Sequence, residues 1–343
     1  MADILNIETG YKLLLAILLA AIGTWLFKKV AWRLNILDKP KGTVPQHVKA
    51  TPYLGGLGIY FGIITSSIVA SFIWSDDIQI SFLIFCFLFM LLGLIDDLLE
   101  LRPMKKFLIQ VVVAIGAAYY CASFDFTGIH IVDLLISAFW YLVLLNAFNV
   151  TDVCDGLLAG LSVVAFLVGA IIFAPNNLVM VISAGATLGY LFFNKPPASI
   201  FMGDAGSHLL GFIAGYITMN TPVVLEGTYS FLILGFLCAV PIFEMTFLIV
   251  MRTLKGKKWY LSSRDHFALR LQRHGFSKWQ TIILAWILAL IATAPIFYII
   301  NESQYQFRIL FIIAAIVVAV FLIFWWYLIK IEKEDDAKLE AGN

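Results

Sequence analysis

The sequence predicts an all-α polytopic membrane protein with about eleven transmembrane helices, and two observations carry the prediction. Hydrophobic residues make up 62% of the 343 positions and charged residues only 13%, which is more apolar surface than one soluble core can hide. Apolar stretches approaching the roughly 20 residues of a membrane-spanning helix recur along the chain. No internal repeat and no soluble domain is found, so residues 1–343 are interpreted as a single integral-membrane domain.

The apolar stretches end at about residue 330, and residues 331–343 are expected to form a short cytoplasmic tail of mixed charge. The fourth and eighth stretches are short for a complete crossing, so the number of helices is approximate. The eleven stretches cover residues 12–32, 54–74, 78–95, 107–121, 129–146, 157–173, 178–193, 207–219, 229–251, 280–300 and 306–329.

The positive charges predict the orientation of these helices. All but two of the 23 Lys and Arg residues follow odd-numbered stretches, and the exceptions are Lys12 and Arg308. Loops rich in Lys and Arg stay in the cytoplasm, so we expect the N-terminus outside and the C-terminus in the cytoplasm. A basic loop rather than a small-residue cleavage site follows the first stretch, which is therefore expected to be a retained helix.

Four polar side chains gather at the inner end of the fifth stretch: Asn146, Asn149, Asp152 and Asp155. Residues three apart are neighbours on a helix, and Gly156 indicates that the helix ends there. A corner of carboxylates and carboxamides suits a hard divalent cation such as Mg²⁺. The alternative is a polar seam between helices, which rarely needs two acids and two amides together.

Two neighbouring acids, Asp96 and Asp97, close the third stretch, and Lys106 opens the fourth. Adjacent side chains on a helix point about 100° apart, so the two acids are expected to have separate roles. Solvated boundary residues are the alternative. In the first cytoplasmic loop, Lys49 either offers a point charge to a phosphate or belongs to an ordinary basic loop.

The connection from Asn194 to Ser207 has the composition of a binding loop that leads directly into a helix. Gly203 and Gly206 let backbone approach a ligand closely, Ser207 suits an N-cap, and Asp204 is placed to hold a metal. The fourth, sixth and eighth helices would all start on the cytoplasmic side. Their positive dipole ends are expected to converge on a bound diphosphate.

The ninth stretch contains Glu244, an acid that is costly within a membrane and is expected to be functional. In the basic loop that follows, the spacing places His266 and Arg270 on one helical face, a cradle for an anionic leaving group. Binding of anionic lipid is the alternative for this loop. A transporter would also explain Glu244, but it predicts broken helices or an inverted repeat, and neither is clear in this sequence.

Nearly all of these residues fall on the predicted cytoplasmic face, which indicates a metal-assisted reaction on an anionic substrate at that leaflet. Membrane lipid is an expected partner and nucleic acid is not. The oligomeric state is left open, a homodimer included.

The chain also resembles the polyprenyl-phosphate N-acetylhexosamine-1-phosphate transferases. Residues 93–110 resemble their Asp-Asp motif, residues 146–156 their Asn-x-x-Asn-x-x-Asp-x-x-Asp-Gly motif, residues 201–207 their Met-Gly-Asp-x-Gly-Ser motif, and residues 47–56 their Pro-x-x-Gly-Gly loop. The resemblance implies transfer of a sugar-1-phosphate from a UDP-sugar similar to UDP-GlcNAc to undecaprenyl phosphate. It further implies Mg²⁺ (or Mn²⁺) dependence, release of UMP, the start of a cell-surface polysaccharide, and a place in the bacterial plasma membrane with the active site in the cytoplasm. The eleven-helix initiating enzymes are more similar than the ten-helix branch that transfers a muramyl pentapeptide.

The resemblance also implies roles for the site residues. Asp204 and Asn149 would bind the metal, and one of Asp96 and Asp97 would orient or deprotonate the lipid phosphate. Developing charge would be stabilised by Lys106, His266 and Arg270. Asp152 and Asp155 would hold the nucleoside or support the metal site, and the other expected substrate-binding residues are Lys49, Asn146, Asn194 and Ser207.

The chain departs from the family pattern in three places, and the third, the reduced histidine motif, concerns recognition of the donor's nucleotide diphosphate. Val153-Cys154 stands where Gly and a hydrophobic residue are usual, Glu244 stands where Asp is usual, and the histidine motif is reduced to His266-Phe-Ala-Leu269. A catalytically impaired relative that keeps the binding site is therefore an alternative interpretation.

Overall fold

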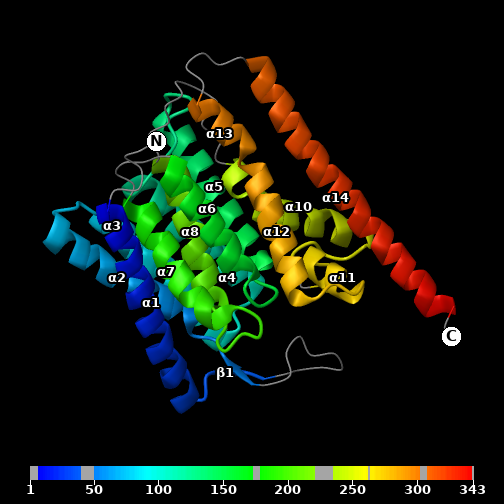
Figure 1. The fold of residues 1–343 in the computed structure, drawn as a ribbon, viewed down its shortest axis with the longest axis horizontal. Helices are drawn as coiled ribbons and strands as arrows, with labels where there is room; N and C mark the ends of the chain where they lie inside the picture. Colours follow the sequence, from blue (N-terminus) through cyan, green and yellow to red (C-terminus); the bar gives the residue numbers. More distant parts are fainter. Residues whose placement is uncertain are drawn as a thin grey trace.

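The computed structural model describes residues 7–39, 50–172, 178–220, 235–261, 263–301 and 307–341. In these residues the protein is almost entirely helical, which confirms the predicted all-α class (Figure 1). One small antiparallel hairpin joins β1 (Leu37–Asp38) to β2 (Thr51–Pro52). The helices are α1 (Ile7–Arg33), α2 (Gly55–Trp74), α3 (Ile80–Leu99), α4 (Pro103–Tyr120), α5 (His130–Thr151), α6 (Leu157–Ile172), α7 (Leu178–Asn194), α8 (Gly203–Asn220), α10 (Ala239–Leu254), α11 (Phe267–Arg273), α12 (Lys278–Ala292), α13 (Ala294–Asn301) and α14 (Phe307–Ala341).

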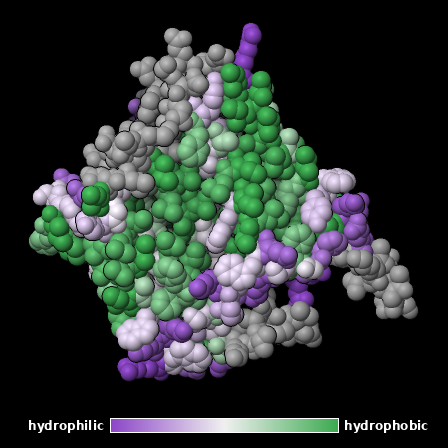
Figure 2. Space-filling view, viewed as in Figure 1, coloured by the Kyte–Doolittle hydropathy of each residue, from purple (hydrophilic) through white to green (hydrophobic). Residues whose placement is uncertain are grey.

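Six segments of the described chain are long and apolar enough to cross a membrane, so the polytopic class is confirmed. They are Ile7–Arg33, Gly55–Trp74, Ile80–Leu99, His130–Thr151, Lys278–Tyr298 and Arg308–Glu334. Eleven crossings and the orientation of the termini stay predictions. Figure 2 shows a broad apolar surface over the middle of the molecule, with hydrophilic residues along its lower edge. In the same view of Figure 1, the β1–β2 hairpin and α11 lie at that edge.

The helix at the centre of the larger core is α8, which packs mainly against α3 and α5. All of its residues from Ala205 to Thr218 are buried. Glycines make this close packing possible, because a Cβ at Gly93 of α3 would overlap the main chain of Asp204, and a Cβ at Gly211 of α8 would press on Leu145. In a lipid environment, where burial of apolar surface does not drive helix association, such close van der Waals contact holds helices together.

A second, smaller core joins α10, α11, α12 and the inner part of α14. Phe247, Phe267, Leu271 and Leu328 are fully buried there. Elsewhere α14 is the least enclosed span, with 11% of its apolar window buried within the protein, and it runs as a long diagonal helix at one side of the bundle (Figure 1).

The structure differs from the expected helix limits in two places. The tenth stretch is divided into α12 and α13, which meet at Thr293. Beyond the expected end at about residue 330, α14 continues to Ala341. This extension is rich in Glu, Lys and Ala, which favour helix, and Lys330 and Glu334 form an i,i+4 ion pair.

Candidate active site

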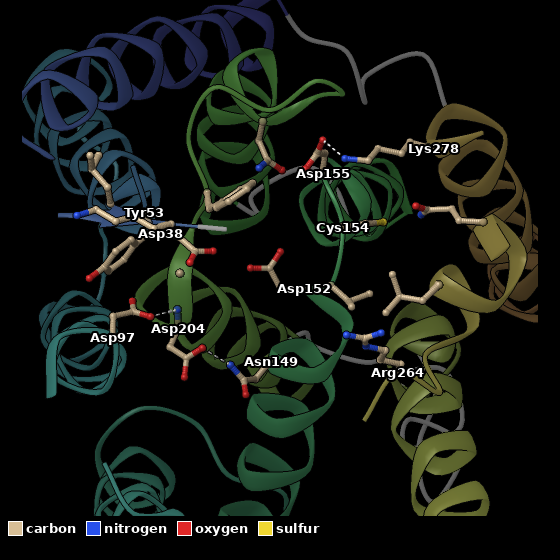
Figure 3. Close-up of a pocket in the computed structure, with 18 of the residues that line it drawn as sticks. Asp38, Tyr53, Asp97, Asn149, Asp152, Cys154, Asp155, Asp204, Arg264 and Lys278 are labelled. Carbon is tan, nitrogen blue, oxygen red and sulfur yellow. Dashed lines mark hydrogen bonds and ion pairs between the residues drawn. The ribbon is translucent and has the colours of Figure 1, made fainter. Parts of the chain in front are cut away.

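A cavity of about 760 Å³ opens between the hairpin, the ends of several helices and the loop before α12. Side chains from segments far apart in the sequence converge on it (Figure 3). Its volume lies in the range of small-molecule sites. Its polar lining includes Asp38, Tyr53, Asp97, Asn149, Asp152, Asp155, Asn194, Asp204, Arg264, Arg273 and Lys278.

The start of α8 is fixed by a carboxylate from another helix. Asp97, near the end of α3, accepts hydrogen bonds from the backbone N–H groups of Asp204 at 2.9 Å and Ala205 at 3.1 Å. A helix N-terminus favours a negative charge at this position. These two N–H groups are already bonded to Asp97, so they are not available to a diphosphate. The expectation that the dipole end of α8 binds a diphosphate directly is therefore wrong.

Asp204 is the centre of the polar site. Its carboxylate accepts a hydrogen bond from Lys106 Nζ at 2.5 Å and another from Asn149 Nδ2 at 2.8 Å. Lys106 also lies 2.7 Å from Asp96, and Asn149 donates to Ser207 Oγ at 3.1 Å. Asp96 and Asp97 thus contact different partners, as the helical geometry predicted.

Behind Asp204 runs a buried chain of side chains that connects three helices. Asn146 of α5 donates to Gln110 Oε1 of α4 at 3.4 Å, and Gln110 Nε2 lies 2.8 Å from His208 Nε2 of α8. The other ring nitrogen of His208 lies 2.6 Å from the carbonyl of Asp204. Sequence reasoning missed His208, although its position one turn after Asp204 was an available signal.

Asp155 and Asn194 hold the 194–202 loop against the start of α6. Asp155 accepts from Lys278 Nζ at 2.8 Å and from the backbone of Ala198 at 3.3 Å. Asn194 accepts from the backbone of Gly156 at 2.9 Å and donates to the carbonyl of Ile200 at 3.0 Å. Both residues line the cavity, but their side chains are engaged in the hydrogen bonds that hold the loop in place.

Asp152 caps the end of α5 and lines the same cavity. Burial, and then the charges of Asp204, Asp97 and Asp155, raise the pKa of its carboxyl to about 8. A carboxyl group whose pKa is raised by neighbouring carboxylates gains from a bound cation.

The opposite wall of the cavity is cationic. Arg264, Arg273 and Lys278 line it, and Figure 3 shows Arg264 on the side away from Asp97. Sequence reasoning did not select these three residues or Asp38 and Tyr53, because nothing local links them to the Asp204 motif.

The predicted cradle of His266 and Arg270 is not found, because neither side chain lines the cavity. His266 is the residue before α11 and lies 2.8 Å from the fully buried Glu244. Glu244 also accepts from the backbone of Phe267 at 3.3 Å. The face of α11 that carries Arg270 also carries Phe267 and Leu271, so it turns into the smaller core.

Comparison with known proteins agrees with the resemblance seen in the sequence. The model of glycosyl transferase family 4 matches residues 79–221. The phospho-N-acetylmuramoyl-pentapeptide-transferase of Staphylococcus carnosus is 31% identical over 281 residues, which are 72% of this chain and 85% of the relative. The chain belongs to glycosyl transferase family 4. Two further relatives are a probable undecaprenyl-phosphate N-acetylglucosaminyl 1-phosphate transferase of Bacillus subtilis, 28% identical over 85% of each chain, and the decaprenyl-phosphate N-acetylglucosaminephosphotransferase of Mycolicibacterium smegmatis, 27% identical over 79% of this chain and 78% of the relative.

Membership of glycosyl transferase family 4 makes this bacterial membrane protein a sugar-phosphate transferase. The transporter alternative is thereby set aside. The segment matched by the family model runs from just before α3 to the end of α8 and contains Asp97, Asp152, Asp155 and Asp204, whereas Asp38 and the cationic wall lie outside it.

The predicted residues thus occupy two layers, one lining the cavity and one behind it. Those that line the cavity are Asp97, Asn149, Asp152, Asp155, Asn194 and Asp204. Those that lie behind it are Asp96, Lys106, Asn146, Ser207, His266 and Arg270. Lys49 lies outside the described residues.

The donor set of the cavity fits a hard cation. Asp204, Asp152 and Asn149 present carboxylate and carboxamide groups, the oxygen ligands that Mg²⁺ prefers. In the part of the chain that the structure describes, no group of three or more His, Cys, Asp or Glu residues is already arranged as a metal site. Mg²⁺ suits such a site, because it binds through one or two carboxylates together with substrate phosphates.

Proposed function

We propose that this protein transfers N-acetylhexosamine-1-phosphate from a UDP-sugar to undecaprenyl phosphate and releases UMP, which starts a cell-surface polysaccharide. The observation that carries the proposal is the position of Asp204, which lies on the cavity wall between Lys106 and Asn149. The names of the relatives support the substrates, because they act on undecaprenyl phosphate or decaprenyl phosphate and on amino-sugar phosphates. Relatives of the pentapeptide-transferring type are about equally similar.

The charge distribution of the cavity suits this reaction. A diphosphate donor needs cations around its oxygens, and a lipid phosphate acceptor must come within bonding distance of it. Arg264 and Arg273 on one wall are placed to hold the diphosphate, since guanidinium groups bind phosphate oxygens in pairs. They replace Arg270 and His266 in our assignment.

Mg²⁺, or Mn²⁺ in its place, would be held by Asp204 and Asn149 and would supply Lewis-acid polarisation of the diphosphate. Asp97 lies on the cavity wall and is placed to orient the lipid phosphate, whereas Asp96 acts through Lys106. An oxygen of the lipid phosphate bonds to the sugar-linked phosphorus of the donor. The bond from that phosphorus to the bridging oxygen breaks, and its electron pair leaves with UMP.

The proposed location is the cytoplasmic face of the bacterial plasma membrane. The cavity lies where α3, α5 and α7 end and where α8 begins. The segment from Arg264 to Lys278, which includes α11, reaches the same end of the bundle. Basic residues of this kind mark the cytoplasmic side. A reporter joined after Asn343 and found outside the cell would contradict this orientation.

One assay tests the proposed function. The purified protein is mixed with undecaprenyl phosphate, Mg²⁺ and each member of a panel of UDP-sugars, and UMP release is measured. Release with a UDP-N-acetylhexosamine, and none without the lipid phosphate, is the expected result. No release from any donor, with the lipid still bound, would instead favour the catalytically impaired relative.

A further inference from the structure

Four charged side chains form a closed network between α14 and the loop that leads to α11. We call Lys255, Asp265, Arg270 and Glu332 the charge clamp. Glu332 lies 2.7 Å from Arg270 Nη1 and 2.5 Å from Lys255 Nζ. Asp265 lies 2.5 Å from Lys255 and 3.3 Å from Arg270 Nη2. Each acid thus contacts both cations, and the four formal charges cancel.

Three members of the charge clamp are enclosed by the smaller core, whereas Lys255 lies at the surface with its side chain 33% exposed. The Arg270 side chain is 1% exposed, Asp265 7% and Glu332 14%. The guanidinium lies 4.9 Å from the ring centre of Phe247 and donates to the carbonyls of Asp265 at 2.9 Å and Leu328 at 3.3 Å. Ion pairs excluded from water fix a geometry, and removing one member leaves its partner charged and unpaired.

The charge clamp reaches the cavity through the backbone of one segment. Asp265 lies between Arg264, which lines the cavity, and His266, which is bonded to Glu244. The carbonyl of Arg264 accepts a hydrogen bond from Arg273 Nη2 at 3.2 Å. The main chain is therefore held at the carbonyl of Arg264 and at the next residue, Asp265, while the Arg264 side chain remains exposed and directed toward the cavity (Figure 3).

The helix that supplies Glu332 has few other attachments within the described chain. Only Leu310, Val317, Phe324, Leu328 and Ile331 of α14 are buried apolar residues, and the last three belong to the smaller core. Apart from contacts of its first part with the larger core and α13, α14 joins the rest of the protein at its inner end, where Glu332 is its charged contact with the loop.

We propose that Glu332 is a positioning residue that, through the charge clamp, places Arg264 against the diphosphate of the nucleotide-sugar donor. The inference rests on the proposed function and extends it to the C-terminal helix. It makes α14 part of the donor side of the site and leaves the lipid side, around Asp97, independent of it.

The chain offers a matched pair of variants for the test. Glu332→Gln removes the buried carboxylate, and Glu334→Gln removes a carboxylate two residues further on that is 44% exposed and lies 3.8 Å from Lys330. Glu332→Gln is expected to raise the KM for the UDP-sugar roughly tenfold, the scale of one lost charge-assisted hydrogen bond. The KM for undecaprenyl phosphate should stay within about twofold. Glu334→Gln should change neither constant.

A purely structural role would lower the amount of folded protein, or change both constants together, and either result would overturn the proposal. Glu332→Asp keeps the charge on a shorter side chain and should give an intermediate KM for the donor. If Glu332→Gln does not fold, Glu332→Asp carries the same test. A KM unchanged from that of Glu334→Gln would refute the positioning role.

A double variant tests whether Glu332 acts through Arg264. Because both changes remove the same contact with the donor, Arg264→Ala and Glu332→Gln together should raise the KM for the UDP-sugar no more than Arg264→Ala alone. If the increases in KM of the two single variants multiply in the double variant, Glu332 acts elsewhere. Absence of UMP release by the wild-type protein would refute the proposed function. Normal wild-type turnover, together with no effect of Glu332→Gln on the KM for the UDP-sugar, would refute the positioning role alone.

Discussion

Asp97 of α3 caps the helix that carries Asp204, so two acids 107 positions apart in the chain share one polar site. The Asp97 carboxylate receives the first free N–H groups of α8, and the Asp204 side chain that emerges there receives Lys106 and Asn149. Asp97 therefore fixes the backbone from which Asp204 projects. Changes at this junction should affect both the stability of the protein and its use of a divalent cation.

Gly203 makes the cap possible, and Gly203→Ala should disrupt it. The residue has φ +69°, and a Cβ there would overlap the Asp97 carboxylate. A left-handed backbone alone costs Ala about 1–2 kcal/mol. Gly128→Ala is the matched control, because Gly128 has φ +70° with open space around it. In thermal unfolding in detergent, Gly203→Ala should lower the midpoint further than Gly128→Ala. Equal shifts would mean that the Asp97 carboxylate moves away from the new Cβ without destabilising the protein.

Asp204→Asn should abolish turnover. The substitution removes the charge that Lys106 balances and that the proposed cation requires. UMP release should fall at least about a hundredfold, as when a group that stabilises transition-state charge is lost, and additional Mg²⁺ should not restore it. Asp125→Asn, which changes an exposed acid in the loop before α5, is the control with normal activity. Unchanged turnover in Asp204→Asn would refute the metal assignment.

His208→Leu tests the buried chain behind Asp204. Without the imidazole, the amide of Gln110 loses a hydrogen-bond partner in a site where it is 1% exposed. An unpaired buried donor costs about 1–3 kcal/mol. The thermal midpoint and the apparent affinity for Mg²⁺ should both fall, whereas His130→Leu at an exposed position should leave both unchanged. Adding Gln110→Leu should recover part of the lost stability, because a pair of apolar side chains leaves fewer unsatisfied groups.

Much of this site could be predicted from the sequence because its acids lie in short motifs at helix ends. Asp96, Asp97, Asn149 and Asp204 were selected from spacing and from the expected polar end of each span, and the structure brings them together. Local spacing carries such information, since residues three or four apart share a helix face.

The cationic side of the site could not be predicted in the same way. The i,i+4 spacing of His266 and Arg270 suggested one face toward a ligand, but α11 begins only at Phe267, and Arg270 pairs with Glu332, 62 positions later. Which face of a short helix turns inward depends on its tertiary partners. The partner here belongs to a helix extension that the hydropathy pattern assigned to a tail.

The pH dependence of stability tests the state of Asp152. Its pKa is raised to about 8, mainly by burial and then by the charges of Asp204, Asp97 and Asp155, whereas an unfolded aspartate titrates near pH ~3.9. Between these values the folded protein binds more protons than the unfolded chain. Its stability should therefore fall as the pH rises from about 4 to about 8 and change little from this cause above that range.

Thermal midpoints measured in EDTA between pH 5 and 9 give this slope. Asp152→Asn should flatten it and raise the midpoint at the alkaline end, because the amide carries no charge to repel its neighbours. Asp125→Asn should keep the slope of the wild type. Mg²⁺ should also reduce the slope, since a cation among the carboxylates removes the cost of ionising them. Equal slopes for the wild type and Asp152→Asn would show that Asp152 is already ionised at low pH, and the charges of Asp97, Asp155 and Asp204 would then favour a bound cation less strongly than proposed.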